Sequence, residues 1–263
     1  MSKYICTDLH GNYNIYKKIK NLLGKSDTLY FLGDSCDRGP DGALILMDII
    51  QDSRVHYILG NHDFFILDWL RHGHDRNHAS NLWIELNGGD LTFEWLKTWS
   101  DEELDYLQEY LEECPGIETL VYKNLQIHLT HAGFNPGDYD FNYLDPEDIS
   151  WDRDHFKYEW TWYEEPDKDD GKWLWGDELN EDNSVIKAEY ENTYIFHGHT
   201  HVYYAKYLHG EDEKEIDKVE PYIYCGGHKI DLDLCTAEHG VAALYDLSNF
   251  IKTREHKWEL IEG

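Results

Sequence analysis

The sequence is poor in cysteine and in long apolar runs, and these shortages argue against two classes of protein. Its five cysteines are an odd, scattered set without a Cys-x-x-Cys pair, which argues against a disulfide framework and favours a reducing compartment. No apolar stretch reaches the length that a membrane-spanning helix needs. Residues 1–5 read as the start of a strand and not as a signal peptide. We therefore expect a cytoplasmic protein with no membrane partner.

Positive charge is also scarce. The chain has 23 Lys and Arg residues against 53 Asp and Glu residues, a formal net charge of −30. Such a field repels duplex nucleic acid, so we expect no duplex partner. It also repels phosphate groups, but salt limits its reach to roughly 8 Å, and a local cluster of metals and arginines can overcome it. We attribute most of the acidity to solvated surface and expect a monomer.

What the sequence does contain is sufficient for a large core. The 263 residues are 41% hydrophobic and 15% aromatic, which fits one large domain or one domain with an insertion. The stretch from about 138 to 192 is rich in Trp, Tyr, Asp and Glu and lacks clean periodicity. We interpret residues 1–263 as a single domain, with an acidic, aromatic-rich insertion or cap over 138–192 beside its site.

The first third of the chain alternates strand and helix patterns. Short apolar strands are predicted at 4–7, 28–32 and 55–59. Helical patterns separate and follow them at 15–23, from Pro40 to 50, and at 64–70. This β-α-β-α-β order predicts parallel strands joined by right-handed crossovers.

The rest of the chain predicts more strands than helices. Residues 90–112 have a helical pattern, and 117–122 and 125–130 form a predicted strand pair. Further strands are expected at 193–196, 221–225, 241–245 and 250–253. Their number predicts a second sheet, and with it an α/β fold of two sheets.

Polar clusters follow the three early strands. They are Asp8-Leu9-His10, Gly33-Asp34 through Gly39, and Gly60-Asn61-His62-Asp63. Because sites in open α/β sheets form at the carboxyl ends of strands, these clusters should converge. Two later clusters, at 131–133 and 197–201, also follow predicted strands. The pooled side chains are carboxylate, imidazole and amide without thiolate, a set that suits Mn, Fe, Zn or Co and not Ca or a structural Zn.

These clusters carry a family resemblance. The series Asp-x-His, Gly-Asp-x-x-Asp-Arg-Gly, Gly-Asn-His-Asp, His-Ala-Gly and Gly-His-Thr, in this order over residues 8–200, resembles the PPP family of metallophosphatases. That family lies within the calcineurin-like metallophosphoesterases, and the chain is most similar to bacterial and phage serine/threonine protein phosphatases. The resemblance implies a two-sheet β-sandwich flanked by helices.

The resemblance also implies roles for individual residues. One metal would be held by Asp8 and His10, a second by Asn61 and two histidines, and both by a bridging aspartate. The implied metal ligands are Asp8, His10, Asp34, Asn61, His131 and His199. His62 would protonate the leaving oxygen, oriented by Asp37. Arg38 would bind the phosphate, together with Arg153 of the Trp151-Asp152-Arg153 segment.

The implied cofactors are two divalent metal ions, with Mn²⁺ expected first and Fe, Zn, Co or Ni as alternatives. A hydroxide bridging the two metals would be the nucleophile. The sequence departs from the family pattern in two places. His201 follows Thr200, and it is either a further metal ligand or a strand-side residue. Leu234-Cys235 stands in a late strand segment where a glycine is frequent in the family, so the geometry of that loop is open.

Taken singly, each residue has a structural interpretation. Asp34 alone would be a helix cap, His131 a core histidine and Arg38 a surface ion-pair partner. The co-occurrence of five motifs reverses that reading, although Arg153 keeps the alternative of a salt bridge within the insertion. Five other histidines are interpreted as structural or surface residues, namely His128, His155, His197, His228 and His239.

The function expected first is that of a serine/threonine protein phosphatase acting on phosphate monoesters. Its substrate would be a phosphorylated protein or a small phosphoester. A dinucleoside polyphosphate hydrolase is the nearest alternative, because that branch shares the metal motifs. A phosphodiesterase or RNA-end phosphatase is a third, indicated by the second histidine at His201. An inactive metal-bound scaffold ranks last, because no ligand or acid of the pattern is missing.

Overall fold

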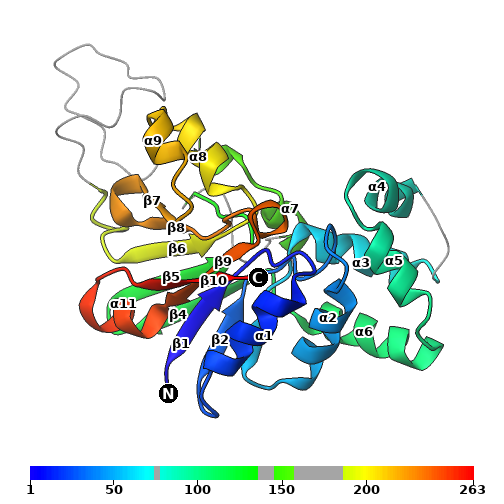
Figure 1. Ribbon diagram of the computed structural model, residues 1–263. Helices are drawn as coiled ribbons and strands as arrows, with labels where there is room; N and C mark the ends of the chain where they lie inside the picture. The colour runs from blue at the N-terminus through cyan, green and yellow to red at the C-terminus, as the bar shows by residue number, and fades with distance from the viewer. Residues whose placement is uncertain (74–77, 136–144, 157–185) are drawn as a thin grey trace.

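Two five-stranded sheets form the centre of the protein (Figure 1). The computed structural model describes residues 1–73, 78–135, 145–156 and 186–263. The strand order is β10-β9-β1-β2-β3 in the first sheet and β4-β5-β6-β8-β7 in the second. The strands are β1 Lys3–Cys6, β2 Thr28–Phe31, β3 Val55–Tyr57, β4 Ile117–Tyr122, β5 Leu125–Thr130, β6 Thr193–His197, β7 Tyr222–Tyr224, β8 Lys229–Asp231, β9 Val241–Asp246 and β10 Trp258–Glu262.

The first sheet contains the predicted β-α-β-α-β unit. Strand β2 pairs in parallel with β1 and with β3. The C-terminal strands β9 and β10 extend this sheet by antiparallel pairing, with β9 beside β1. The helices of this half are α1 Tyr13–Leu22, α2 Gly42–Gln51, α3 Asn61–Arg71, α4 His78–Leu86, α5 Asp90–Leu96 and α6 Asp101–Glu113.

Alternation of side chains along the strands divides the apolar core into layers. On the outer face of the first sheet, Cys6 and Phe31 pack against helix residues such as Ile45 and Leu67. The alternate positions face the other way, and Ile5 and Tyr30 belong to the core that joins the two sheets. That inner core also contains Ile127, Leu129, Phe196 and Ile230 of the second sheet.

The outer face of the second sheet is covered by shorter elements. Phe134, Ile149 and Phe156 pack there against Ile195 and Tyr224. The remaining helices are α7 Pro146–Ser150, η1 Asp154–Phe156, α8 Val202–Leu208, α9 Glu213–Ile216, η4 Cys225–Gly227, α10 Thr236–His239 and α11 Leu247–Thr253. Within the described ranges, none of the helices is both long and apolar enough to cross a bilayer.

The structure corrects three expectations. The predicted strand at 250–253 is wrong, because these residues end α11, whose first turn is capped by the Asp246 side chain. The helical stretch 90–112 is two helices, since Ser100 and Glu103 form a capping box that starts a new one. Pro40 precedes α2 by two residues and does not open it. Most of the predicted insertion at 138–192 lies outside the described residues.

Candidate metal centre

The predicted clusters meet at one edge of the sandwich, where strands of both sheets end. Asp8 follows β1, Asp34 follows β2, and Asn61 is the first residue of α3, close after β3. His131 follows β5 and His199 follows β6, so these two come from the second sheet. All five side chains are buried, as is His10. The carboxyl ends of strands from both sheets therefore enclose a single polar site.

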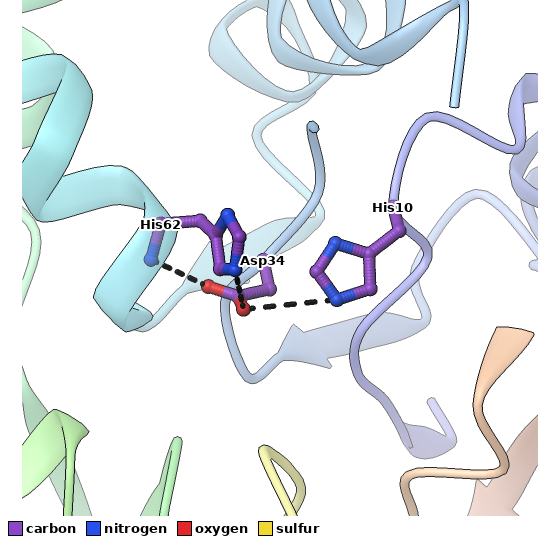
Figure 2. A group of neighbouring side chains, drawn as sticks. All are labelled: His10, Asp34 and His62. Atoms are coloured by element: carbon purple, nitrogen blue, oxygen red, sulfur yellow. Dashed lines mark hydrogen bonds and ion pairs between the residues drawn. The ribbon is translucent and has the colours of Figure 1, made fainter. Parts of the chain in front are cut away.

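Asp34 lies at the middle of this site (Figure 2). Its Oδ2 is 3.8 Å from Nε2 of His10, 3.8 Å from Nε2 of His62 and 3.5 Å from Nε2 of His131. Two groups of side chains bring their ligand atoms within 4.8 Å of one another, one of His10, Asp34 and His62 and one of Asp8, Asp34 and His131. Asp34 belongs to both groups, which is the position that a bridging ligand requires.

Asn61 links the two histidines of the second sheet. Its Oδ1 is 2.9 Å from Nε2 of His131 and 2.8 Å from Nδ1 of His199. The far ring nitrogens of His131 and His10 donate to backbone carbonyls of Leu32 and Cys36, which orients each ring toward the centre.

Two buried nitrogens of the site lack hydrogen bonds. Nε2 of His10 and Nε2 of His199 find no hydrogen-bond partner in the part of the chain that the structure describes. A buried polar atom without a partner is costly unless something else binds it. These two nitrogens, with the carboxylate and amide oxygens around them, fit a first-row divalent cation.

The loops of the site have constrained backbones. Asp8, His10, Asp34 and His199 all have positive φ, between 42° and 66°, a region that non-glycine residues enter at a cost of about 1–3 kcal/mol. Asp63 helps to hold two of the loops, because its Oδ2 accepts hydrogen bonds from the backbone N–H groups of Gly60 and Asp34. No role is predicted for Asp63 from the sequence, although it stands inside the Gly-Asn-His-Asp motif.

Burial and charge set the ionisation of the site. Burial, with the neighbouring Asp34, raises the pKa of Asp8 to about 6. Burial also acts to raise the pKa of Asp34, but His131 and His62 outweigh it and hold that pKa well below its usual value. The two carboxylates in turn outweigh burial at His131 and raise its pKa to about 10.

The pKa values of His10 and His199, the other two histidines predicted as metal ligands, shift in the opposite direction. Burial lowers the pKa of His10 well below its usual value, and the Arg38 charge acts in the same direction. Burial and the charge of His131 likewise lower the pKa of His199 well below its usual value. Both imidazoles are therefore neutral at physiological pH, the form in which a ring nitrogen can bind a metal.

His62 is held differently from the other histidines. Its Nδ1 is 2.6 Å from Oδ2 of Asp37, and its Nε2 is 3.3 Å from Nη2 of Arg38. Burial opposes ionisation of His62, but Asp34 and Asp37 outweigh it and raise its pKa. By distance alone His62 could be a ligand. The Asp37 carboxylate at Nδ1 and the raised pKa favour the protonated ring, so the arrangement suits a proton donor.

Arg153 approaches the site from the segment before η1. It is exposed by accessible area, yet enough protein surrounds its guanidinium for burial to lower its pKa, and the charges of Arg38 and Asp34 act on it. Trp151 holds this segment in place, with its ring 5.8 Å from those of His199 and Phe65 in edge-to-face contact. The structure therefore brings Arg153 within electrostatic range of the centre.

His201 precedes α8 as its N-terminal cap residue, so the interpretation as a strand residue is wrong. Its Nδ1 is 3.0 Å from the hydroxyl of Tyr203, and its Nε2 is 3.7 Å from Oδ2 of Asp233. It belongs to neither of the two ligand groups found among the described residues.

Two of the remaining histidines have structural contacts. His197 Nε2 is 2.8 Å from the Tyr224 hydroxyl, and His228 Nδ1 donates to the Thr193 carbonyl. Trp83 and Thr92, both of which contact Asp37, are not predicted from the sequence. The only signal for them was the Gly88-Gly89 pair between their helices.

The dense set of carboxylates and imidazoles at the strand ends of this two-sheet α/β fold is suited to a divalent metal centre. Residues 1–229 match the profile of the calcineurin-like phosphoesterases. The chain belongs to the calcineurin-like phosphoesterase family, as its motifs predicted.

Two kinds of enzyme are among its relatives. Over 141 residues it is 26% identical to serine/threonine-protein phosphatase 2 of Escherichia coli K12, covering 52% of this chain and 61% of that protein. Over 140 residues it is 29% identical to the symmetrical bis(5'-nucleosyl)-tetraphosphatase of Nitrosomonas europaea, covering 52% of this chain and 46% of that one. The matched region thus spans less than two thirds of either relative.

Solved structures confirm the predicted fold. A putative diadenosine tetraphosphatase aligns with a TM-score of 0.56 at 14% identity, covering 99% of this chain and 93% of that one. A protein serine/threonine phosphatase from Saccharomyces cerevisiae aligns with a TM-score of 0.51 at 13% identity, covering 100% and 80%. At these identities the likeness is one of fold.

Proposed function

We propose that this metallophosphoesterase hydrolyses phosphate monoesters and acts as a serine/threonine protein phosphatase. The observation that carries the proposal is Asp34, shared by two buried ligand groups with the His62–Asp37 pair and Arg38 beside it. The proposed metal ligands are Asp8, His10, Asp34, Asn61, His131 and His199.

Two divalent ions, Mn²⁺ in our proposal, would supply Lewis acidity toward the phosphate oxygens and an activated water for attack at phosphorus. The chain's own residues have separate tasks. Arg38 binds phosphate oxygens through its guanidinium, and Arg153 adds a second cation at the mouth of the site. His62 protonates the leaving oxygen from Nε2, because its Nδ1 is engaged by Asp37.

The groove beside the site supports a polypeptide substrate. It starts at Asn61 and is lined by the aromatic rings of Phe64, Phe65 and Trp151 and by the carboxylates of Asp68 and Glu147. Among the described residues that line it, Arg71 is the arginine, and it forms an ion pair with Glu112 of α6.

A second nucleotide with its phosphate chain would meet these carboxylates as like charges. A neutral or basic peptide flank avoids this repulsion, and its side chains can pack on the aromatic rings. The groove therefore favours a phosphoprotein. Tetraphosphatase activity is the second candidate, which the relatives of that kind support.

One panel of substrates tests the proposal. Protein dialysed against a chelator is assayed with a phosphoserine peptide, diadenosine tetraphosphate, a cyclic nucleotide and an aryl phosphate, before and after addition of Mn²⁺, Zn²⁺ or Co²⁺. We expect activity to be lost on chelation, restored by Mn²⁺, and highest in kcat/KM for the phosphopeptide. Full activity after verified metal removal would contradict metal dependence. A higher kcat/KM for diadenosine tetraphosphate would assign the protein to the second candidate function.

A further inference from the structure

Asp37 has a second N–H donor that no motif includes. Its Oδ2 lies 2.6 Å from Nδ1 of His62 and also accepts a hydrogen bond from Nε1 of Trp83, at 2.7 Å. Trp83 is fully buried on α4. Oδ1 of Asp37 is buried and accepts no hydrogen bond within the described residues. The two donors therefore act on one oxygen and leave the other without a partner.

The segment that carries Trp83 also holds the backbone at this point. The N–H of Asp37 donates to Oγ1 of Thr92, at 3.0 Å, and the N–H of Arg38 donates to the carbonyl of Gly88, at 2.8 Å. Asp37 and Arg38 both have left-handed backbones, with φ of 69° and 62°. Such conformations persist when the surrounding structure fixes them, and here α4, α5 and the turn between them supply that support.

The indole itself has no room to move. A Cβ on Gly89 would lie 2.0 Å from Nε1 of Trp83, so only glycine allows the backbone to pass so close to the ring. On its other sides the indole packs against Trp69 and Phe93, with ring centroids 6.3 Å and 6.1 Å away. A donor locked in this way can define the position of the group that it bonds.

We propose that Trp83 is a positioning residue for proton transfer by His62. Its N–H fixes the rotation of the Asp37 carboxylate, so that the oxygen that it bonds also faces the imidazole. This orientation keeps the His62 proton at Nδ1 directed at Asp37 and turns Nε2 toward Asp34 and Arg38. The side-chain hydrogen bond and ring contacts of Trp83 among the described residues are with Asp37, Trp69 and Phe93, none of which is a proposed metal ligand. The inference rests on the proposed function, since the role of His62 as an acid is part of it.

Trp83→Phe tests the inference, because it keeps an aromatic ring and removes the N–H. For a phosphoserine peptide we expect kcat to fall by up to roughly 100-fold, the loss that misorientation can cause, with KM and metal content unchanged. For an aryl phosphate, whose phenolate leaves without a proton, the fall should be much smaller. Trp69→Phe, in the same aromatic cluster, is the matched control and should leave the ratio of the two rates as it is.

A second variant guards against misfolding of the first. Site-specific replacement of Trp83 by 3-benzothienylalanine keeps the shape of the indole and exchanges only the N–H for sulfur. The same kinetic pattern is expected. In combination with Asp37→Asn, either change at position 83 should cause little further loss, because both act through one hydrogen-bonded unit.

Proton NMR of metal-free protein supplies a readout that needs no turnover. The Nδ1 proton of His62 should give a downfield resonance that shifts or broadens in the Trp83 variants and not in Trp69→Phe. Equal losses for both leaving groups, additivity with Asp37→Asn, or an unchanged resonance would each overturn the inference. Wild-type protein without activity on any phosphate monoester would instead refute the proposed function, and the resonance would still decide the role of Trp83.

Discussion

Gly198 lies so close to Asp8 that a Cβ on the glycine would be 2.1 Å from Oδ2 of the carboxylate. The same oxygen accepts hydrogen bonds from Oγ1 of Thr7 and the N–H of His199. We therefore expect Gly198→Ala to displace Asp8, to lower the free energy of unfolding by about 1–3 kcal/mol, as overpacking does, and to weaken Mn²⁺ binding. Urea denaturation and calorimetric titration measure the two effects.

Gly210→Ala is the control for this prediction. Gly210 has a positive φ, which Gly198 does not, but a Cβ there would meet nothing within 4 Å. The Gly210→Ala variant should lose some stability but should bind Mn²⁺ as tightly as the wild type. Unchanged Mn²⁺ binding in Gly198→Ala would argue that Asp8 is not a ligand.

The next prediction separates the proton donor from the metal ligands. We expect His62→Asn to retain the metal content of the wild type and to lose roughly 10²–10⁴-fold in kcat on a phosphoserine peptide, the usual contribution of a general acid. The loss should be smaller on an aryl phosphate, and Asp37→Asn should show a milder version of both effects. Metal analysis and kinetics on the two substrates decide whether His62 is a proton donor or a metal ligand. Loss of a metal in His62→Asn would make His62 a ligand.

Substitution of the two arginines near the site should lower kcat/KM by different amounts. Arg38→Ala should lower kcat/KM by roughly 10- to 100-fold, the equivalent of a charged hydrogen bond. Arg153 is exposed, so Arg153→Ala should have the same direction and a smaller size. Steady-state kinetics and phosphate inhibition check both. Arg54→Ala, which removes a partly buried guanidinium paired with Asp52, is the control. If Arg153→Ala has the same kinetics as this control, Arg153 does not contact the phosphate.

The acidic lining of the groove predicts a charge preference. Glu147→Lys should raise kcat/KM for phosphopeptides with acidic flanks and lower it for those with basic flanks, each by about two- to fivefold, as expected for exposed ion pairs. Hydrolysis of an aryl phosphate should not change. Glu102→Lys, an exposed change of equal charge on α6, should have no effect on peptide selectivity. Equal selectivity in all three proteins would exclude the groove from substrate binding.

A buried histidine outside the site predicts how acid destabilises the fold. Burial lowers the pKa of His128, on β5, to about 4. In the unfolded chain the ring binds a proton near pH 6.5. Between these values the unfolded state holds the extra proton, so stability falls as the pH falls, by roughly 3 kcal/mol from this residue. Between pH 7 and pH 4, the free energy of unfolding of His128→Gln should fall by less than that of the wild type. Urea denaturation at a series of pH values measures this difference.

How far the sequence predicts this structure depends on whether a pattern is local. The strand at 28–32 is mostly apolar, and the strand at 125–130 begins with alternating apolar and polar residues. Each pattern lies within the strand itself, and both positions are predicted correctly. The 250–253 segment was wrong because Phe250 and Ile251 fit a strand equally well, and only the Asp246 cap and the packing of Phe250 between the sheets decide for a helix.

The site shows the same division. Asp8, Asp34 and Asn61 could be placed together because each follows a strand of one parallel unit. The contact of Trp83 with Asp37 joins residues 46 apart through a helix whose own sequence contains no motif. Such a contact depends on how α4 packs against α3 and α5, and no pattern along the chain records that packing.

The origin of the site in two sheets bears on the order in which the protein can mature. On a growing polypeptide, Asp8, Asp34 and Asn61 leave the ribosome more than a hundred residues before His199, and β9, which borders β1, follows still later. Domains are completed from the N-terminus onward during synthesis, but this centre closes only when the second sheet is laid against the first. Capture of the proposed metals would therefore come late in synthesis, after the strands of both sheets have been made.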